Sequence, residues 1–180
     1  MIARTKALSF IENVVLIPTH IPPHKDAIMT PFSHRQAMLE RAAKKEGCRI
    51  SWIEMERHSP SWTVDTVRQF EQENPGIPFY YLIGSDSYYQ LHTWKSPRDL
   101  LDMISFIVVN REKSADPDRA KAYLDRYFSK DDWHRFYFID DEAVDVASRD
   151  IRAERRANQD ISQWVPDYIV RYIEENGAYD

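Results

Sequence analysis

The sequence predicts an α/β protein with a Rossmann-like, doubly wound parallel sheet and C-terminal helices. Short β-rich runs alternate with polar stretches of helical length along the chain. The β-rich runs are apolar at successive positions, without the alternation of a half-exposed strand. Alternating strands and helices build βαβ units. Strands that are apolar on both faces belong to a sheet covered by helices on both sides.

Five runs are the predicted strands, and each is followed by a turn residue or a polar loop. They are Val14–Ile17, Arg49–Met55, Phe79–Ile83, Phe106–Val109 and Phe136–Ile139.

Between and after these runs lie the predicted helices, several with recognisable end signals. Ser33 with Gln36 predicts a capping box, and Gly47 predicts the end of the same helix. Ser96 and Asp116 each precede a proline, as caps before the first helical position often do. The helices are Ile2–Phe10, Ser33–Lys45, Thr63–Glu73, Pro97–Met103, Pro117–Phe128, Ser148–Ala157 and Pro166–Asn176.

Length and composition predict one folded domain over residues 1–180. Hydrophobic residues make up 43% of the chain and charged residues 29%, which excludes wholesale disorder. The net charge of −5 makes the chain a poor general nucleic-acid binder. No apolar run approaches the ~18 residues of a membrane span, so we expect no membrane partner.

The single cysteine, Cys48, excludes an internal disulfide and a multi-cysteine metal site, and suggests a reducing compartment. The first residues, Met1–Glu12, are too short and too charged for a signal peptide. We therefore expect a cytoplasmic protein. The sequence leaves its oligomeric state open.

Ligands of such sheets bind at the carboxyl ends of the strands, so the residues there are the candidates for a site. A loop stiffened by three prolines, Pro18–Lys25, follows the first strand and carries His24 and Lys25. It is either a phosphate site or a rigid surface turn. Thr63, after the second strand, belongs either to an anion site at a helix start or to an ordinary helix cap.

The later strand ends carry further candidates. Gly84 and Asp86 can approach a ligand and hold a ribose hydroxyl pair. Trp94 either stacks on an aromatic ring or packs at the rim of the core, and Arg111 places a cation after the fourth strand. After the last strand, Ser148–Arg152 forms either a polyphosphate clamp or a charged amphipathic helix.

Together these segments resemble bacterial nicotinate-nucleotide adenylyltransferases, members of the nucleotidyltransferase superfamily. The resemblance runs from Ile2 to the end of the chain. Its motifs are Ile17-Pro18 through Pro22-Pro23-His24-Lys25, Pro60-Ser61-Trp62-Thr63 with Asp65-Thr66, Ile83-Gly84-Ser85-Asp86, Trp94, and Val165-Pro166 with Asn176-Gly177.

The resemblance implies the transfer of AMP from ATP to nicotinate mononucleotide, giving deamido-NAD and pyrophosphate in NAD biosynthesis, with Mg²⁺ accompanying ATP. It implies two sets of binding residues. The residues for the mononucleotide are His24, Lys25, Thr63 and Trp94, and those for ATP are Gly84, Asp86, Arg111, Ser148 and Arg152.

The chain departs from the family pattern in two places. The family begins with a strand, a glycine-rich turn and a His-x-Gly-His signature, and this sequence contains none of them. The segment Ala147–Arg152 also differs from the family's Ser-Ser-Thr-x-Ile-Arg. No catalytic residue is therefore assigned, and we expect a start-truncated, poorly active chain that lacks the first central strand. Without that strand, the runs Val14–Ile17 and Phe79–Ile83 should either flank a gap or pair directly.

Two other functions fit the same residues. One is a non-catalytic paralogue that binds a nucleotide, and the other is an adenylyltransferase for a different phosphorylated acceptor.

Overall fold

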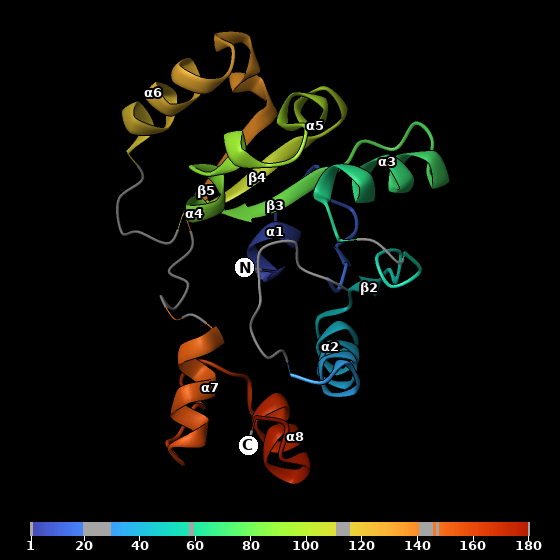
Figure 1. Ribbon diagram of the computed structural model, residues 1–180, viewed down its shortest axis with the longest axis vertical. Coiled ribbons are helices and arrows are strands. Elements are labelled where there is room, and N and C mark those ends of the chain that lie inside the picture. The colour runs from blue at the N-terminus through green and yellow to red at the C-terminus, as the bar shows by residue number, and fades with distance from the viewer. Residues whose placement is uncertain are drawn as a thin grey trace. The chain divides into compact units, whose positions relative to one another are not determined.

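The computed structural model describes residues 2–19, 30–57, 60–110, 116–140, 146 and 148–179 (Figure 1). The chain forms two compact units. Most of the first is the segment Ile53–Ala143, and the second combines Ile2–Pro18, His24–Trp52 and Val144–Asp180. The strands are parallel, and helices alternate with them, as the sequence predicted.

A three-stranded parallel sheet forms the centre of the first unit. Its strands are β3 (Tyr80–Gly84), β4 (Ser105–Asn110) and β5 (Phe136–Asp140), in the order β3-β4-β5. Gly84 pairs with Val109, and Asn110 with Asp140, so the three strands end close to the same level. The predicted runs are confirmed, with ends that differ by one residue.

Three helices pack against one face of this sheet: α3 (Thr63–Glu73), α5 (Pro97–Met103) and α6 (Pro117–Tyr127) (Figure 1). They share one core with alternate residues of the strands. The core members from the strands are Ile83, Phe106, Val108 and Phe136, and those from the helices are Val64, Val67, Leu100, Leu101, Ala120, Tyr123 and Leu124.

Short helical elements that the sequence did not predict complete this unit. They are α4 (Ser85–Tyr88), η1 (Leu91–Thr93) and η2 (Lys130–Arg135). At most six residues long, such elements have too few turns to show a helical repeat in the sequence. The start of η2 carries a capping box between Ser129 and Asp132.

Asp132 also fastens η2 to α5. The carboxylate is 5% exposed and accepts two hydrogen bonds from Arg98, at 2.6 and 2.8 Å. These bonds hold the pKa of Asp132 below its usual value. The predicted cap at Asp116 is confirmed, because its carboxylate accepts from the backbone N–H groups of Asp118 and Arg119.

The second unit contains a smaller sheet and four helices. β1 (Val15–Leu16) and β2 (Arg49–Ile50) pair in parallel. The helices are α1 (Ile2–Lys6), α2 (Phe32–Glu46), α7 (Ser148–Arg156) and α8 (Asp167–Asn176). Gly47 ends α2 with a φ of 63°, as predicted.

Three expectations for this part of the chain are wrong. The second strand ends at Ile50 rather than Met55, and a turn follows. The capping box at Ser33 is absent, because α2 begins one residue earlier with Pro31 at the cap position. The first helix ends at Lys6 rather than Phe10. Of the two arrangements expected for the first and third strands, direct pairing is not found among the described residues, because β1 pairs with β2 and β3 with β4; the gap stays a prediction.

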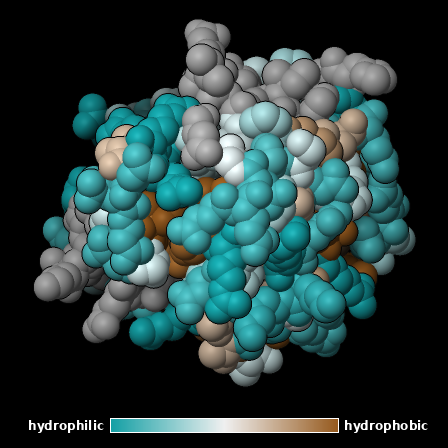
Figure 2. Space-filling view, turned by 90° about the horizontal axis from the view of Figure 1, so that it is seen from below, coloured by the Kyte–Doolittle hydropathy of each residue, from teal (hydrophilic) through white to brown (hydrophobic). Residues whose placement is uncertain are grey.

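A second hydrophobic cluster lies around α8 and contains Ile169, Tyr172 and Ile173. The Tyr172 hydroxyl and the Nδ1 atom of His34 on α2 are hydrogen bonded at 2.9 Å. Figure 2 shows hydrophilic side chains over most of the described surface on one face of the molecule. Among the helices described, none has the length and apolar character needed to cross a membrane.

Candidate functional site

The carboxyl end of β3 carries the two predicted ribose residues. Gly84 is both the last residue of β3 and the cap of α4, with φ −80° and ψ 162°. Asp86 lies in the first turn of α4, where its side chain is exposed. The structure thus places this pair together at the sheet edge where ligands of such sheets bind.

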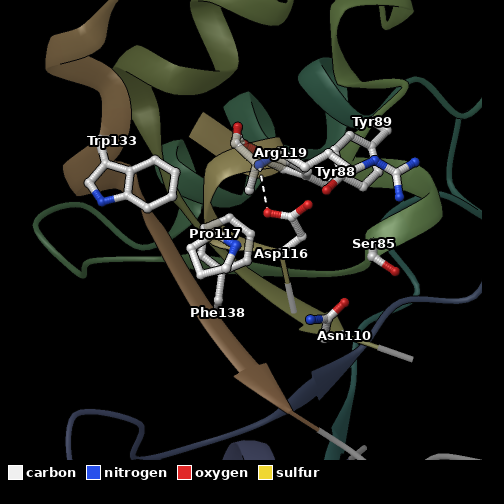
Figure 3. Close-up of a pocket in the computed structure, with 10 residues that line it drawn as sticks. Ser85, Tyr88, Tyr89, Asn110, Asp116, Pro117, Arg119, Trp133 and Phe138 are labelled. Atoms are coloured by element: carbon white, nitrogen blue, oxygen red, sulfur yellow. Dashed lines mark hydrogen bonds between the residues drawn. The ribbon is translucent and has the colours of Figure 1, made fainter. Parts of the chain in front are cut away.

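Ser85, between them, lines a pocket of about 170 Å³ (Figure 3). Aromatic rings form much of its wall, with polar groups beside them. Its residues are Ser85, Tyr88, Tyr89, Asn110, Asp116, Pro117, Arg119, Ala120, Trp133 and Phe138. The Trp133 and Phe138 rings stack with centroids 5.3 Å apart, and the Arg119 guanidinium lies 4.5 Å from the Tyr89 centroid. Such walls suit a flat ring, and the Asn110 amide and the Asp116 carboxylate can form hydrogen bonds with the edge of that ring.

Tyr88 is a fixed part of this wall. Its side chain is buried, and its hydroxyl donates to the carbonyl of Ala120 at 2.9 Å. Burial raises the pKa of Tyr88 above its ordinary value, so the phenol stays neutral. The residue therefore contributes an apolar ring and no charge.

A second group, which we name the ring cluster, consists of Thr63, Tyr81 and Trp94. Thr63 is the first residue of α3, and the cap before it, Trp62, makes no side-chain cap bond. The helix-cap alternative for Thr63 is therefore wrong. The Thr63 hydroxyl instead opposes the rise that burial causes in the pKa of Tyr81, which is the effect of a donor beside the phenol oxygen. Trp94 meets the Tyr81 ring edge-on, with centroids 6.2 Å apart and planes at 86°.

Trp94 is half-buried and packs against the core of the first unit. The rim position that the sequence left open is thus confirmed, and it remains compatible with stacking on a ligand. Sequence reasoning missed Tyr81, the residue that joins the other two. An aromatic residue on a strand looks like ordinary core, so no signal in the sequence singled it out.

Behind the ring cluster runs a set of buried hydrogen bonds, which we name the polar chain: Arg57, Thr66 and Glu54. Arg57 donates to the Thr66 hydroxyl at 2.5 Å, and Thr66 donates to Glu54 Oε1 at 2.8 Å. Glu54 is only 6% exposed. Among the described atoms, Glu54 Oε2 and Arg57 Nη1 are buried without a hydrogen-bond partner.

The polar chain influences Tyr81 through charge. Burial is the main cause that raises the pKa of Tyr81, the Thr63 interaction opposes it, and the negative charge of Glu54 adds to the rise. Tyr81 is therefore a neutral phenol at physiological pH and can act as a donor.

Two of the predicted phosphate residues, Ser148 and Arg152, belong to the second unit. Ser148 is the exposed first residue of α7, and Arg152 follows one turn later. No residue of α7 is buried. The charge of Arg152 opposes the effect of burial, which raises the pKa of Tyr179, so these two side chains are neighbours within the second unit.

Three predicted site residues, His24, Lys25 and Arg111, lie outside the described part of the chain. The common position of the candidates after predicted strands predicts one cleft lined by His24, Thr63, Asp86, Trp94 and Arg152, and with His24 outside the described residues this stays a prediction. Of these five, Thr63 and Trp94 are brought together through Tyr81, and Asp86 follows the same strand, β3.

Comparison with known proteins gives matches over nearly the whole chain. The family described as cytidylyltransferase-like matches residues 2–154. The nicotinate-nucleotide adenylyltransferase of Bacillus subtilis is 30% identical over 172 residues, 94% of this chain and 84% of the relative. A protein of Bacillus pumilus named "Probable nicotinate-nucleotide adenylyltransferase" is 32% identical over the same shares.

A solved structure of similar fold is the Plasmodium falciparum nicotinic acid mononucleotide adenylyltransferase complexed with NaAD. It is 20% identical and has a TM-score of 0.77, covering 99% of this chain and 88% of that protein. The Rossmann-like fold class predicted from the sequence is thereby confirmed. From the family match and the two bacterial relatives it follows that this chain belongs to the nicotinate-nucleotide adenylyltransferases, within the cytidylyltransferase-like nucleotidyltransferases.

Proposed function

We propose that this chain binds ATP and nicotinate mononucleotide and takes part in the transfer of AMP between them. The observation that carries the proposal is the ring cluster, in which Tyr81 of β3 lies beside both Thr63 and Trp94. A flat aromatic acceptor suits the exposed part of Trp94, and a hydroxyl beside it suits a polar substituent on that ring.

In the proposed reaction, a phosphate oxygen of the mononucleotide attacks the α-phosphorus of ATP in line. One P–O bond forms, the bond to the β-phosphate oxygen breaks, and pyrophosphate leaves with the bonding electron pair. The protein needs no nucleophile for this step, because catalysis rests on positioning and on stabilising charge. The chain's own part is to orient the acceptor ring at Trp94 and the ATP ribose at Gly84 and Asp86.

The neighbouring aromatic pocket lies on the ATP side of this arrangement. Ser85 belongs to both the pocket and the turn between Gly84 and Asp86. We assign His24, Lys25, Arg111, Ser148 and Arg152 to the phosphates as part of the same proposal. Cations and a hydroxyl at a helix start are the groups that phosphate oxygens prefer.

Mg²⁺ enters this proposal with ATP. Among the residues described, no three His, Cys, Asp or Glu side chains are grouped as a metal site. A triphosphate supplies oxygen ligands itself, and Mg²⁺ keeps several waters, so few protein ligands are needed. The ion would neutralise charge that develops on the departing pyrophosphate.

The test is an acceptor panel with ATP and Mg²⁺, followed by pyrophosphate release. Nicotinate mononucleotide should give pyrophosphate and deamido-NAD, whereas a panel of other phosphorylated acceptors should give less. Faster release with a different acceptor would contradict the proposed substrate.

A second candidate, a nucleotide-binding protein without turnover, follows from one sequence observation. The chain contains no His-x-Gly-His segment, and such donors typically contribute about 10²–10³ each to the rate. Calorimetry separates the two candidates. Binding of ATP and of nicotinate mononucleotide without any pyrophosphate would favour the binding protein.

A further inference from the structure

We propose that the ion pair between Lys95 and Asp65 holds Trp94 in place for the acceptor ring, so that both charged residues are positioning residues. The inference rests on the proposed function, in which Trp94 orients that ring. It adds two residues that act through Trp94 rather than by touching the acceptor.

The segment that follows Trp94 has a backbone conformation that its sequence disfavours. Trp94 is extended, with φ −72° and ψ 158°, but Ser96 has φ 48° and ψ 58°. Glycine adopts this left-handed region freely, whereas other residues meet a steric cost there. The Ser96 side chain makes no cap bond that would offset it. Such strain persists only where the surrounding structure fixes the backbone, so contacts outside the segment hold it.

Four charges of alternating sign supply contacts on the solvent side of this segment. Lys95 Nζ lies 2.9 Å from Asp65 Oδ2, and Asp65 Oδ1 lies 3.8 Å from Arg68 Nη1. Arg68 also pairs with Asp99. Asp65 and Arg68 belong to α3, which packs against α5 (Figure 1). Since Lys95 and Asp99 lie on either side of Ser96, the network fastens both ends of the strained segment to α3.

The ion pair also joins the two segments that carry the proposed acceptor residues. Asp65 lies two residues after Thr63 in the first turn of α3, and Lys95 directly follows Trp94. Lys95 Nζ lies 5.7 Å from the centroid of the Trp62 ring, within the range of a cation–π interaction. The pair therefore sets how Trp94 lies relative to the start of α3.

The exposure of the pair indicates binding rather than stability as its role. The side chains of Lys95 and Asp65 are 45% and 32% exposed. Ion pairs at such exposure contribute little to the free energy of unfolding. A wall that is fixed before the ligand arrives nevertheless improves affinity, because the ligand does not have to order it. Loss of the pair should therefore appear mainly in the Kd of the acceptor.

The experiment compares Lys95→Gln with Asp65→Asn, which change the net charge in opposite directions. If Lys95 attracted the anionic acceptor directly, Lys95→Gln would weaken binding and Asp65→Asn would strengthen it. An ion pair that positions Trp94 is lost in both variants, so both should weaken binding. Calorimetry with nicotinate mononucleotide and with ATP gives the Kd values, and thermal unfolding establishes that each variant is folded.

Lys121→Gln is the matched control. Lys121 is also an exposed lysine above a tryptophan, with Nζ 5.4 Å from the centroid of the Trp133 ring, but it belongs to α6. Its substitution removes the same charge as Lys95→Gln without touching the segment after Trp94.

For Lys95→Gln and for Asp65→Asn we expect the Kd of nicotinate mononucleotide to rise about fivefold, the upper range for an exposed ion pair. The Kd of ATP should stay within about twofold. Lys121→Gln should leave the mononucleotide Kd within about twofold. The double variant of Lys95→Gln and Asp65→Asn should bind no more weakly than either single variant, because one ion pair can be lost only once.

Three results would overturn the inference and leave the proposed function standing. They are an unchanged or lower mononucleotide Kd in Asp65→Asn, additive losses in the double variant, and equal losses for the mononucleotide and ATP. Failure of the unsubstituted protein to bind nicotinate mononucleotide would instead remove the proposed function, and the inference with it.

Discussion

The ring cluster of the first unit and the α7 residues of the second unit differ in how firmly the surrounding chain holds them. Tyr81 meets Trp94 edge-on and lies beside Thr63, and both rings pack against the core of the first unit. Ser148 is exposed, and the helix that carries it with Arg152 has no buried residue.

The difference follows from the chemistry of the two ligand parts. A flat ring gains from a wall that is rigid and partly dry before the ligand arrives. Cations attract a phosphate over a longer range than ring packing acts. The cations stay hydrated until the phosphate binds. Under the proposed assignment, the ring is recognised by groups built into the core, whereas the phosphates are recognised by groups at the surface.

The largest expected effect comes from breaking the support of the ring cluster. Thr66→Val keeps the shape of the side chain but leaves Glu54 and Arg57 without their shared hydroxyl. Each buried group that loses its partner costs about 1–3 kcal/mol, so the free energy of unfolding should fall by about 3 kcal/mol. Urea unfolding measures it.

Thr93→Val is the matched control, because it removes a threonine hydroxyl that bonds the backbone carbonyl of Gln90 but lies exposed. Its unfolding free energy should change by less than about 0.5 kcal/mol. Similar losses in the two variants would show that the polar chain does not support the fold.

Asp132→Asn sharpens the comparison by loosening α5, which begins three residues after Trp94. The folded-state pKa of Asp132 is lowered, chiefly by Arg98. The contribution of Asp132 to stability is therefore complete above its pKa in the unfolded chain, about 3.9, and is lost as pH falls through the lower folded-state pKa. At pH 7 the substitution should cost about 2 kcal/mol. Unfolding from pH 7 to pH 2.5 should show a shallower fall in the variant, and an unchanged slope would contradict this.

Trp94→Ala tests the ring cluster directly by calorimetry. Aromatic stacking contributes roughly 0.5–1.5 kcal/mol beyond burial, so the Kd of nicotinate mononucleotide should rise about tenfold while that of ATP holds. Trp164→Ala, in the second hydrophobic cluster, is the control that removes a tryptophan far along the chain. Equal weakening of both substrates would make Trp94 a packing residue.

Ser148→Ala should give the smallest effect. Loss of one exposed hydroxyl at a helix start should raise the Kd of ATP about threefold and leave the mononucleotide unaffected. Its unfolding free energy should change by less than about 0.5 kcal/mol, unlike Thr66→Val. A large loss of stability would mean that α7 is held as firmly as the ring cluster.

The same division explains what could be predicted from the sequence. Apolar runs and helix ends located the strands and the longer helices, and α3 has the predicted bounds of Thr63–Glu73. The second strand was predicted too long because Ile53 is apolar. Ile53 is buried, but it belongs to a turn rather than to a strand. Motif residues identified Thr63 and Trp94.

The residues between and behind them were not predictable. Tyr81 is a residue type that is common in protein cores. What distinguishes it is its position beside Thr63 and Trp94. Glu54 was not expected in the interior, since carboxylates are almost never fully buried unless paired. A sequence gives the type of each residue but not the contacts that turn a core ring or a buried carboxylate into part of a site.

Gly84 differs from the other glycines of the chain. Gly47, Gly76 and Gly177 adopt positive φ angles that other residues resist. Gly84, at φ −80°, needs no such freedom. What glycine leaves out at this position is a side chain, and that lets a bound molecule approach the backbone at the end of β3 closely.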